Sequence, residues 1–153
     1  GSRLQAAFDH AFHKGASRVV TIGSDCPSLP PSLLSQALEA LSESDVVLGP
    51  ATDGGYYLIG LANQGSGNDR YRTLFKDIAW STETVYEQTL DAIDDVRLTL
   101  MELPEWSDVD QPADLLRLID QVRWHRDAGD RDLAMYTEPM LHALRARIET
   151  TSK

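Results

Sequence analysis

Apolar side chains recur at helical spacing in several parts of the chain and predict its helices. Between residues 3 and 14, Leu4, Phe8 and Phe12 lie four residues apart, and Gly15 follows as a C-terminal stop. Further helices are predicted at "PPSLLSQALEAL" (30–41), "YRTLF" (71–75), "STETVYEQTLDAI" (81–93), "QPADLLRLIDQVRWHR" (111–126) and "TEPMLHALRARIE" (137–149). The helix at residues 81–93 would begin with a capping box, with Ser81 or Thr82 as the capping residue.

Short apolar runs between these helices predict strands. They lie at residues 19–22, 45–48, 56–61 and 97–103. Because strand and helix alternate, the chain is predicted to be a layered α/β domain around a largely parallel sheet.

Two of the predicted strands adjoin an acidic residue and flexible glycines. Asp25 follows the first strand within "IGSDCPSLP", a place where ligands bind in open α/β sheets. It could hold a metal–phosphate group or could cap the turn before the next helix. In "TDGGYY", the paired glycines allow either close approach to a ligand or a simple hairpin. Tyr56 and Tyr57 should point to opposite faces of their strand.

A third group of acids lies in "WSDVDQPADLL", just before a predicted helix. If this segment is extended, Asp108 and Asp110 face opposite ways. One of them could then reach Asp25 while the other caps the helix that begins at Gln111 or Pro112. Alternatively, both acids complement the dipole at the start of that helix.

Charge and composition narrow the choice of partners. The chain carries 24 acidic and 14 basic residues, a formal charge of −10, which argues against binding to a nucleic-acid polymer. Excess carboxylate instead favours a hard metal ion. A single cysteine, Cys26, excludes an internal disulfide and favours a reducing, cytoplasmic location. No apolar run approaches the roughly 20 residues that a membrane span requires.

Taken together, four motifs resemble one protein family. They are "IGSDCPSLP", "DVVLGPATDGGYYLIGL", "IAWSTETV" and "DVDQPADL", and the resemblance that they carry covers roughly residues 1–118. In this order they resemble the bacterial, radical-SAM/selenodomain-associated transferases of the glycosyltransferase A-like (nucleotide-diphospho-sugar transferase) superfamily. The last motif is also similar to the "D-x-D-T-P-x-D-L" segment of sugar-nucleotide cytidylyl- and guanylyltransferases, with Gln111 in the place of Thr.

The resemblance implies a Rossmann-like, three-layer sheet of the glycosyltransferase-A type and a role for each motif. Asp25 and Asp110 would hold Mg²⁺ or Mn²⁺, and Asp53 and Asp108 would be the catalytic acids. The ligands would be a nucleotide-sugar or NTP and a small-molecule acceptor. The residues implied to bind the substrate are Gly54, Gly55, Tyr56, Trp80, Ser81 and Thr82.

The resemblance also implies what this chain does not contain. Members of the family begin with a strand and a Gly/Lys/Arg loop that grips the nucleotide, and neither is found in this sequence. Residues 1–118 are therefore expected to be the C-terminal part of the transferase-like domain, and residues 119–153 a helical extension. Strand 19–22 would then be an exposed edge, open to a covering element or to homo-oligomerisation.

Three functions are compatible with these features. The first is a metal-dependent glycosyltransferase that uses a nucleotide-sugar donor. The second is a guanylyl- or cytidylyltransferase-like nucleotidyltransferase, in which the metal assists attack on an NTP. The third is a catalytically silent binding or scaffold domain.

Overall fold

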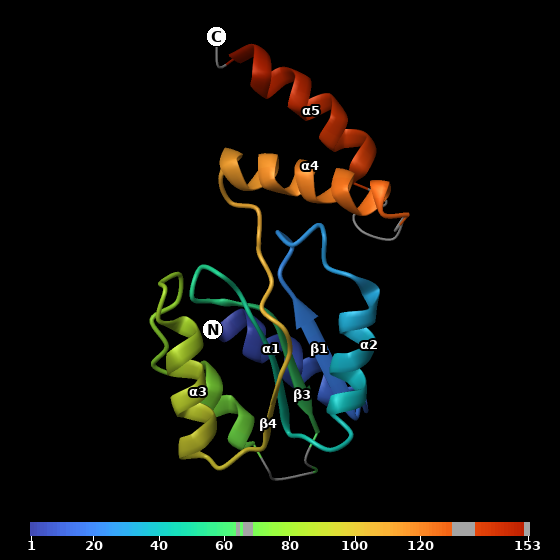
Figure 1. The fold of residues 1–153 in the computed structure, drawn as a ribbon. Helices are drawn as coiled ribbons and strands as arrows, with labels where there is room; N and C mark the ends of the chain where they lie inside the picture. Colours follow the sequence, from blue (N-terminus) through green and yellow to red (C-terminus); the bar gives the residue numbers. More distant parts are fainter. Residues whose placement is uncertain (64, 66–68, 130–136, 152–153) are drawn as a thin grey trace. The chain divides into compact units, whose positions relative to one another are not determined.

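The computed structural model describes residues 1–63, 65, 69–129 and 137–151 (Figure 1). The described chain forms two compact units. Unit 1 contains residues 1–23 and 32–107, and unit 2 contains residues 24–31 and 108 onward. The predicted boundary near residue 118 falls within a helix of unit 2, and the division into a transferase-like domain and an extension stays a prediction.

Unit 1 is built on a four-stranded sheet in the order β1-β3-β2-β4. The strands are β1 (Arg18–Ile22), β2 (Val46–Pro50), β3 (Tyr56–Ala62) and β4 (Leu100–Glu102). Strands β2 and β4 are parallel, whereas β3 is antiparallel to both β1 and β2. The sheet is therefore mixed, and the prediction of a largely parallel sheet is wrong for β3. Only residues 51–55 join β2 to β3, too few for the crossover that parallel strands require.

Helices cover both faces of this sheet (Figure 1). One face packs against α1 (Ser2–His13), the 3₁₀ helix η1 (Arg70–Phe75) and α3 (Val85–Asp95), and α2 (Pro31–Ala40) packs against the other. The buried core of the first face comprises Phe8, Val46, Leu48, Ile59, Leu61, Leu74, Phe75, Ile93 and Leu98. On the second face, Leu33, Ala37 and Leu41 are buried. The predicted layered α/β class is confirmed.

Two elements begin at least three residues later than the sequence pattern predicts. The capping box at Ser81 or Thr82 is wrong, because α3 begins at Val85 with Thr84 as its N-cap. The strand predicted from residue 97 is reduced to three residues. Arg97 has a left-handed backbone with a φ of 53°, which interrupts an extended strand.

Unit 2 contains α4 (Pro112–Asp127), α5 (Glu138–Thr151) and the loop of residues 24–31. An ion pair of 2.5 Å between Arg126 and Glu138 links the two helices. The predicted helices of the extension are thus confirmed where they are described, and residues 130–136 and 152–153 lie outside the description. Among the described helices, none combines the length and apolar character needed to cross a bilayer.

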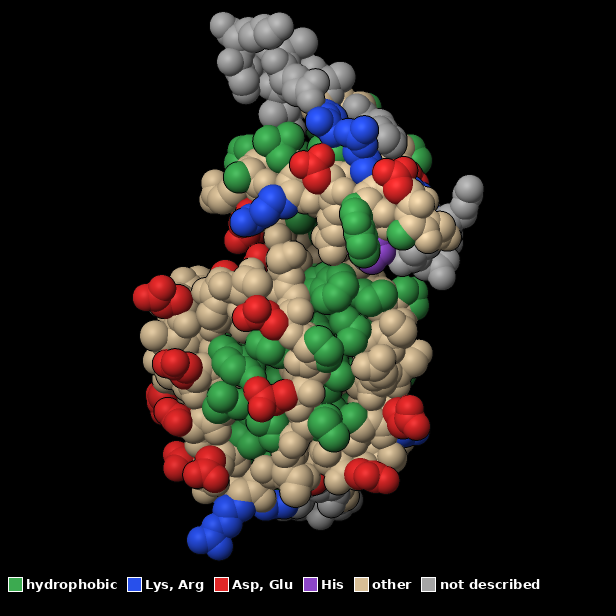
Figure 2. Space-filling view, in the orientation of Figure 1, with side chains coloured by type: hydrophobic (Ala, Val, Ile, Leu, Met, Phe, Trp, Pro, Cys, Tyr) green, Lys and Arg blue, Asp and Glu red, His purple; other side chains and the backbone are tan. Residues whose placement is uncertain are grey.

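Strand β1 lies at one edge of the described sheet, as predicted, with β3 as its neighbour. The side chain of Ile22 at its end is about half exposed, at 51%. Figure 2 shows one face of unit 1, on which Asp and Glu side chains lie both at the rim and among the apolar side chains of the middle. Acidic groups are thus spread over this face, in keeping with the negative net charge.

Candidate functional site

Three aspartates come together in unit 2. Asp25, Asp108 and Asp110 each offer one carboxylate oxygen, and these three oxygens lie within 4.8 Å of one another. Asp25 and Asp110 are exposed, whereas Asp108 is partly buried. The structure thus brings together the two predicted metal ligands and one of the two predicted catalytic acids. We refer to these three residues as the acid cluster.

The backbone joins the two segments that carry the acid cluster. The N–H of Val109 donates to the carbonyl of Asp25 at 2.9 Å, although these residues are far apart in the sequence. The loop that carries Asp25 is tightened by a turn in which Leu29 N–H donates to the Cys26 carbonyl at 3.1 Å. Both sides of the cluster are therefore held by main-chain hydrogen bonds as well as by chain connectivity.

Another acid, Asp114, organises the start of α4. Its Oδ2 accepts hydrogen bonds from the N–H groups of Gln111 at 2.8 Å and Asp110 at 3.2 Å. The hydrogen bond from Gln111 is the main reason that the pKa of Asp114 lies below its usual value, followed by contributions from Asp110 and Arg117. The expectation that Asp108 or Asp110 caps this helix while the other reaches Asp25 is wrong. Both acids join the cluster, and Asp114 is the acid that accepts the hydrogen bonds at the helix start.

Sequence reasoning passed over Asp114, although a signal for it was present. An acid three residues after a helix-capping position is a recognised feature of helix starts.

The competing interpretation of Asp25 as a cap is not favoured by the position of the next helix, which begins six residues later at Pro31. Cys26 is buried, and its thiol donates to Asp25 Oδ1 at 3.9 Å.

The composition of the acid cluster suits one kind of ligand. Three carboxylates this close repel one another, by about 1 kcal/mol for each pair at 4 Å in water. A divalent cation would relieve that repulsion, and oxygen donors are the ligands that Mg²⁺ and Ca²⁺ prefer. Because two of the three side chains are exposed, water or phosphate oxygens could complete the coordination of such an ion.

The other predicted catalytic acid, Asp53, lies in unit 1 and supports its own turn. Its Oδ1 accepts a hydrogen bond of 2.8 Å from the N–H of Gly55. Gly54 has a φ of +87°, and a Cβ at this position would overlap the backbone of Glu83. The hairpin interpretation of "TDGG" is thus confirmed, and Gly54 provides close approach to another segment of the protein. A catalytic role for Asp53 stays a prediction.

The predicted substrate-binding residues of unit 1 gather around this hairpin. The rings of Tyr56 and Trp80 pack edge to face with centroids 6.4 Å apart. The N–H of Tyr86, at the start of α3, donates to the carbonyl of Gly54 at 2.9 Å. The "DGGY" and "WST" segments are therefore neighbours in unit 1, although their contact with a substrate stays a prediction.

The polar groups of these segments have distinct environments. The hydroxyl of Tyr56 is buried without a hydrogen-bond partner, and burial raises the pKa of this phenol well above its usual value. Ser81 is exposed and has a left-handed backbone with a φ of 64°, a strained conformation for a non-glycine residue. Thr82 Oγ1 donates to the carbonyl of Ala79 at 2.6 Å. This hydroxyl therefore shapes the turn that precedes α3.

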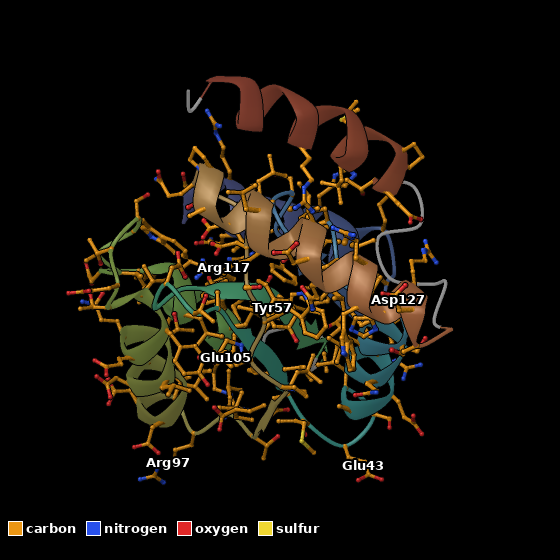
Figure 3. All side chains as sticks on the ribbon, turned by 45° about the horizontal axis from the view of Figure 1, so that its top comes forward. Glu43, Tyr57, Arg97, Glu105, Arg117 and Asp127 are labelled. Atoms are coloured by element: carbon orange, nitrogen blue, oxygen red, sulfur yellow. The ribbon has the colours of Figure 1, made fainter. Side chains whose placement is uncertain are left out.

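Tyr57 has a different role from Tyr56. Its hydroxyl donates to the Pro104 carbonyl at 2.9 Å, and its ring lies against Gly49, where a Cβ would overlap it. Figure 3 shows Tyr57 inside unit 1, whereas Glu43 and Arg97 point outward at its lower edge in this view. The two adjacent tyrosines thus have different neighbours, as the strand pattern predicts.

Unit 1 also has a cavity of about 600 Å³ away from the predicted residues. It is lined by Ser17, Arg18, Leu41, Ser42, Glu43, Ser44, Asp45, Ala62, Asn63 and Arg70. Arg18 and Arg70 each donate to main-chain carbonyls, of Leu38 at 2.7 Å and of Val96 at 3.1 Å. The polar groups of this cavity thus take part in loop contacts, and none of the predicted site residues lines it.

Comparison with known proteins agrees with this architecture. The chain is similar to the crystal structure of a "putative nucleotide-diphospho-sugar transferase" from Desulfovibrio desulfuricans G20, with a TM-score of 0.79 and 34% sequence identity. The similarity covers 97% of this chain and 60% of that chain, so the present chain spans less than two thirds of its neighbour. The mixed sheet with its helices thus matches a nucleotide-sugar transferase-like fold.

Two further comparisons concern the sequence alone. No curated protein matches the chain. The profile of one family, described as "Uncharacterized protein conserved in bacteria (DUF2064)", matches residues 1–82, more than half of the chain. The chain therefore belongs to the DUF2064 family.

Proposed function

We propose that this chain is part of a metal-dependent transferase that uses a nucleotide-sugar donor, with the acid cluster as its cation site. The observation that supports this proposal best is the approach of three carboxylates from two segments, since Asp25 precedes Asp108 by 83 residues. The similarity to a nucleotide-diphospho-sugar transferase from Desulfovibrio desulfuricans G20 supports the choice of donor. A cytoplasmic location is part of the same proposal and rests on the single cysteine.

The proposed ion is Mg²⁺ or Mn²⁺. Asp25 and Asp110 would be ligands, and Asp108, proposed as a catalytic acid, is placed well enough to contribute as a third ligand. The bound ion would neutralise the charge that develops on the diphosphate leaving group. The chain's own part is to hold the carboxylates together in a partly exposed place, where the phosphates of a donor can reach them.

The remaining proposed roles concern unit 1. Asp53 is proposed as the second catalytic acid, and "DGGY" and "WST" are proposed to line the donor-sugar or acceptor side. Their support is that both segments lie together around the hairpin turn. The strained Ser81 adds to this support, because such conformations are concentrated at functional sites.

Calorimetry with UDP or GDP, with and without Mn²⁺, tests the proposal. We expect metal-dependent nucleotide binding by the wild type and at least a tenfold loss in Asp25→Ala, since removal of a ligand leaves the ion underbound. Asp91→Ala, an exposed acid on α3, is the matched control and should bind as the wild type does. Binding that does not depend on metal, or an Asp25→Ala variant with wild-type affinity, would contradict the proposal and favour a scaffold domain.

The type of transfer is tested by the products of the full-length natural protein. With a nucleotide-sugar donor, release of free nucleoside diphosphate supports sugar transfer. Release of pyrophosphate from an NTP supports nucleotidyl transfer instead. The melting temperature of Asp25→Ala should remain close to that of the wild type, because an exposed acid contributes little to the core.

A further inference from the structure

Asp114 lies beside the acid cluster in the sequence but is not one of its three members. Both of its carboxylate oxygens have partners. Oδ2 accepts from the N–H groups of Asp110 and Gln111, and Oδ1 accepts from the guanidinium of Arg117. The side chain of Asp114 is only 14% exposed, whereas Arg117, labelled on α4 in Figure 3, is 77% exposed. Asp114 thus faces the backbone that leads into the cluster.

The segment between Asp108 and Gln111 is consequently held at two places. Val109 is bound to the backbone of Asp25 at 2.9 Å, and Asp110 and Gln111 are bound to the side chain of Asp114. Val109 lies between two members of the cluster, so these hydrogen bonds fix the backbone on both sides of Asp110. Without such restraint, mutual repulsion would favour separation of the three carboxylates.

We infer that Asp114 is a positioning residue for the cation site: it fixes the main chain that carries Asp108 and Asp110 and binds no ion itself. This inference rests on the proposed function of the acid cluster. Partners behind the ligands of a metal commonly change its affinity by 10- to 100-fold when they are replaced. Asp114 also stabilises the start of α4, so a test must separate metal affinity from the stability of the helix.

The geometry suggests which substitutions make that separation. Both main-chain N–H groups donate to the same oxygen of Asp114, and an asparagine can supply one such acceptor. Asp114→Asn should therefore retain the position of the segment while losing the charge and the ion pair with Arg117. Asp114→Ala removes the acceptor altogether. Asp120→Ala is the matched control, because Asp120 is also on α4, pairs with Arg145 at 3.4 Å and is 73% exposed.

The experiment is a titration with Mn²⁺ alone, in which the free ion is measured by electron paramagnetic resonance. It is carried out at a temperature at which circular dichroism shows each variant to be folded. We expect the Kd for Mn²⁺ to rise about tenfold or more in Asp114→Ala, and to stay within about threefold of the wild type in Asp114→Asn. The Asp120→Ala variant should bind as the wild type does.

Each result has a distinct meaning. If the wild type binds Mn²⁺ and Asp114→Ala binds it equally well, Asp114 is only a helix cap and the inference is wrong, whatever the melting temperature shows. If the wild type does not bind Mn²⁺, the cation site itself is wrong and the inference falls with it. Should Asp114→Ala fail to fold, Asp114→Ser decides, because its shorter side chain ends in a single hydroxyl oxygen that cannot take the place of the carboxylate oxygen accepting both main-chain N–H groups. Wild-type affinity for Mn²⁺ in Asp114→Ser would then overturn the inference.

Discussion

Two acid-containing loops of this protein look alike in sequence but differ in structure. Asp25 follows β1 in "GSDCP", and Asp53 precedes β3 in "TDGG". The carboxylate of Asp53 accepts the N–H of Gly55, two residues away, and so closes its own turn. The carboxylate of Asp25 instead faces Asp108 and Asp110, and its carbonyl accepts the N–H of Val109.

The difference shows what distinguishes a candidate site from a turn. An acid that satisfies a nearby N–H has a sufficient structural reason for being there. Acids that lie among other acids repel one another, so their approach has a cost that the hairpin turn does not have. The proposed cation would remove that cost, and the following substitutions test this contrast between the acid cluster and the hairpin turn.

The largest expected effect belongs to the hairpin turn, at Gly54. Gly54→Ala should lower the free energy of unfolding by about 2–5 kcal/mol, through a left-handed backbone and overlap with the backbone of Glu83. Chemical denaturation measures this loss. Gly15→Ala is the matched control, because Gly15 has a similar φ of +91° but open space around its Cα. If both variants lose the same free energy of unfolding, the left-handed backbone alone explains the need for glycine, and the close approach of Gly54 to Glu83 does not contribute.

The second prediction compares Asp110→Asn with Asp53→Asn by thermal unfolding. Without divalent ions, Asp110→Asn should be slightly more stable than the wild type, because it removes repulsion within the acid cluster. With Mn²⁺ at 100 times its Kd, the wild type should gain about 2.7 kcal/mol, and Asp110→Asn should lose most of this gain.

Asp53→Asn should respond to Mn²⁺ as the wild type does, since an asparagine oxygen can still accept the Gly55 N–H. The contrast between the two loops would be lost if both variants showed the same response to the ion. The contrast would be sharpened if Asp110→Asn were more stable than the wild type without Mn²⁺ and less stable than the wild type with it, while Asp53→Asn showed no such reversal.

A smaller effect is expected at Asp9, an acid whose partners are side chains of a neighbouring element. Its Oδ1 accepts from Tyr71 at 2.5 Å and from Arg72 at 3.1 Å. The Tyr71 hydrogen bond, with a further contribution from Arg72, lowers the pKa of Asp9 below its usual value of 3.8. Since the folded pKa lies below the unfolded one, this stabilisation is present above pH 3.8 and is lost as the pH falls through the folded value.

Asp9→Asn should therefore cost about 0.5–1 kcal/mol near neutral pH, as is usual for a partly exposed ion pair. The difference from the wild type should shrink as the pH falls below 3.8, which urea denaturation at a series of pH values can follow. A difference that stays constant down to the lowest pH would show that the carboxylate charge of Asp9 is not involved.

Local patterns are sufficient to predict most elements, because helical and strand periodicity depends on nearby residues. The direction of β3 does not follow from such periodicity, although the short 51–55 connection is typical of an antiparallel pair. The acid expected at the start of α4 is Asp108 or Asp110, although Asp114, three residues after the N-cap Gln111, occupies the position at which a capping box places its acid. The approach of Asp25 to Asp108 and Asp110 is non-local: local spacing allows one of the two later acids to reach Asp25, and the family resemblance implies that Asp110 does so, but neither predicts that both do.

The smallest change in stability is expected at the edge strand β1, where the effect should be on association instead. Ile22 is 51% exposed at the end of a β-branched strand that pairs with β3 in the described sheet, and such edges can pair with another chain. We expect light scattering to show concentration-dependent dimers of the wild type. Ile22→Lys should abolish them while changing the free energy of unfolding by less than about 0.5 kcal/mol, because a charged side chain opposes edge pairing without entering the core. Arg3→Lys is a control with unchanged charge on α1. A wild type that remains monomeric at high concentration would contradict the prediction, because the exposed edge of β1 would then not pair with a second copy of the chain.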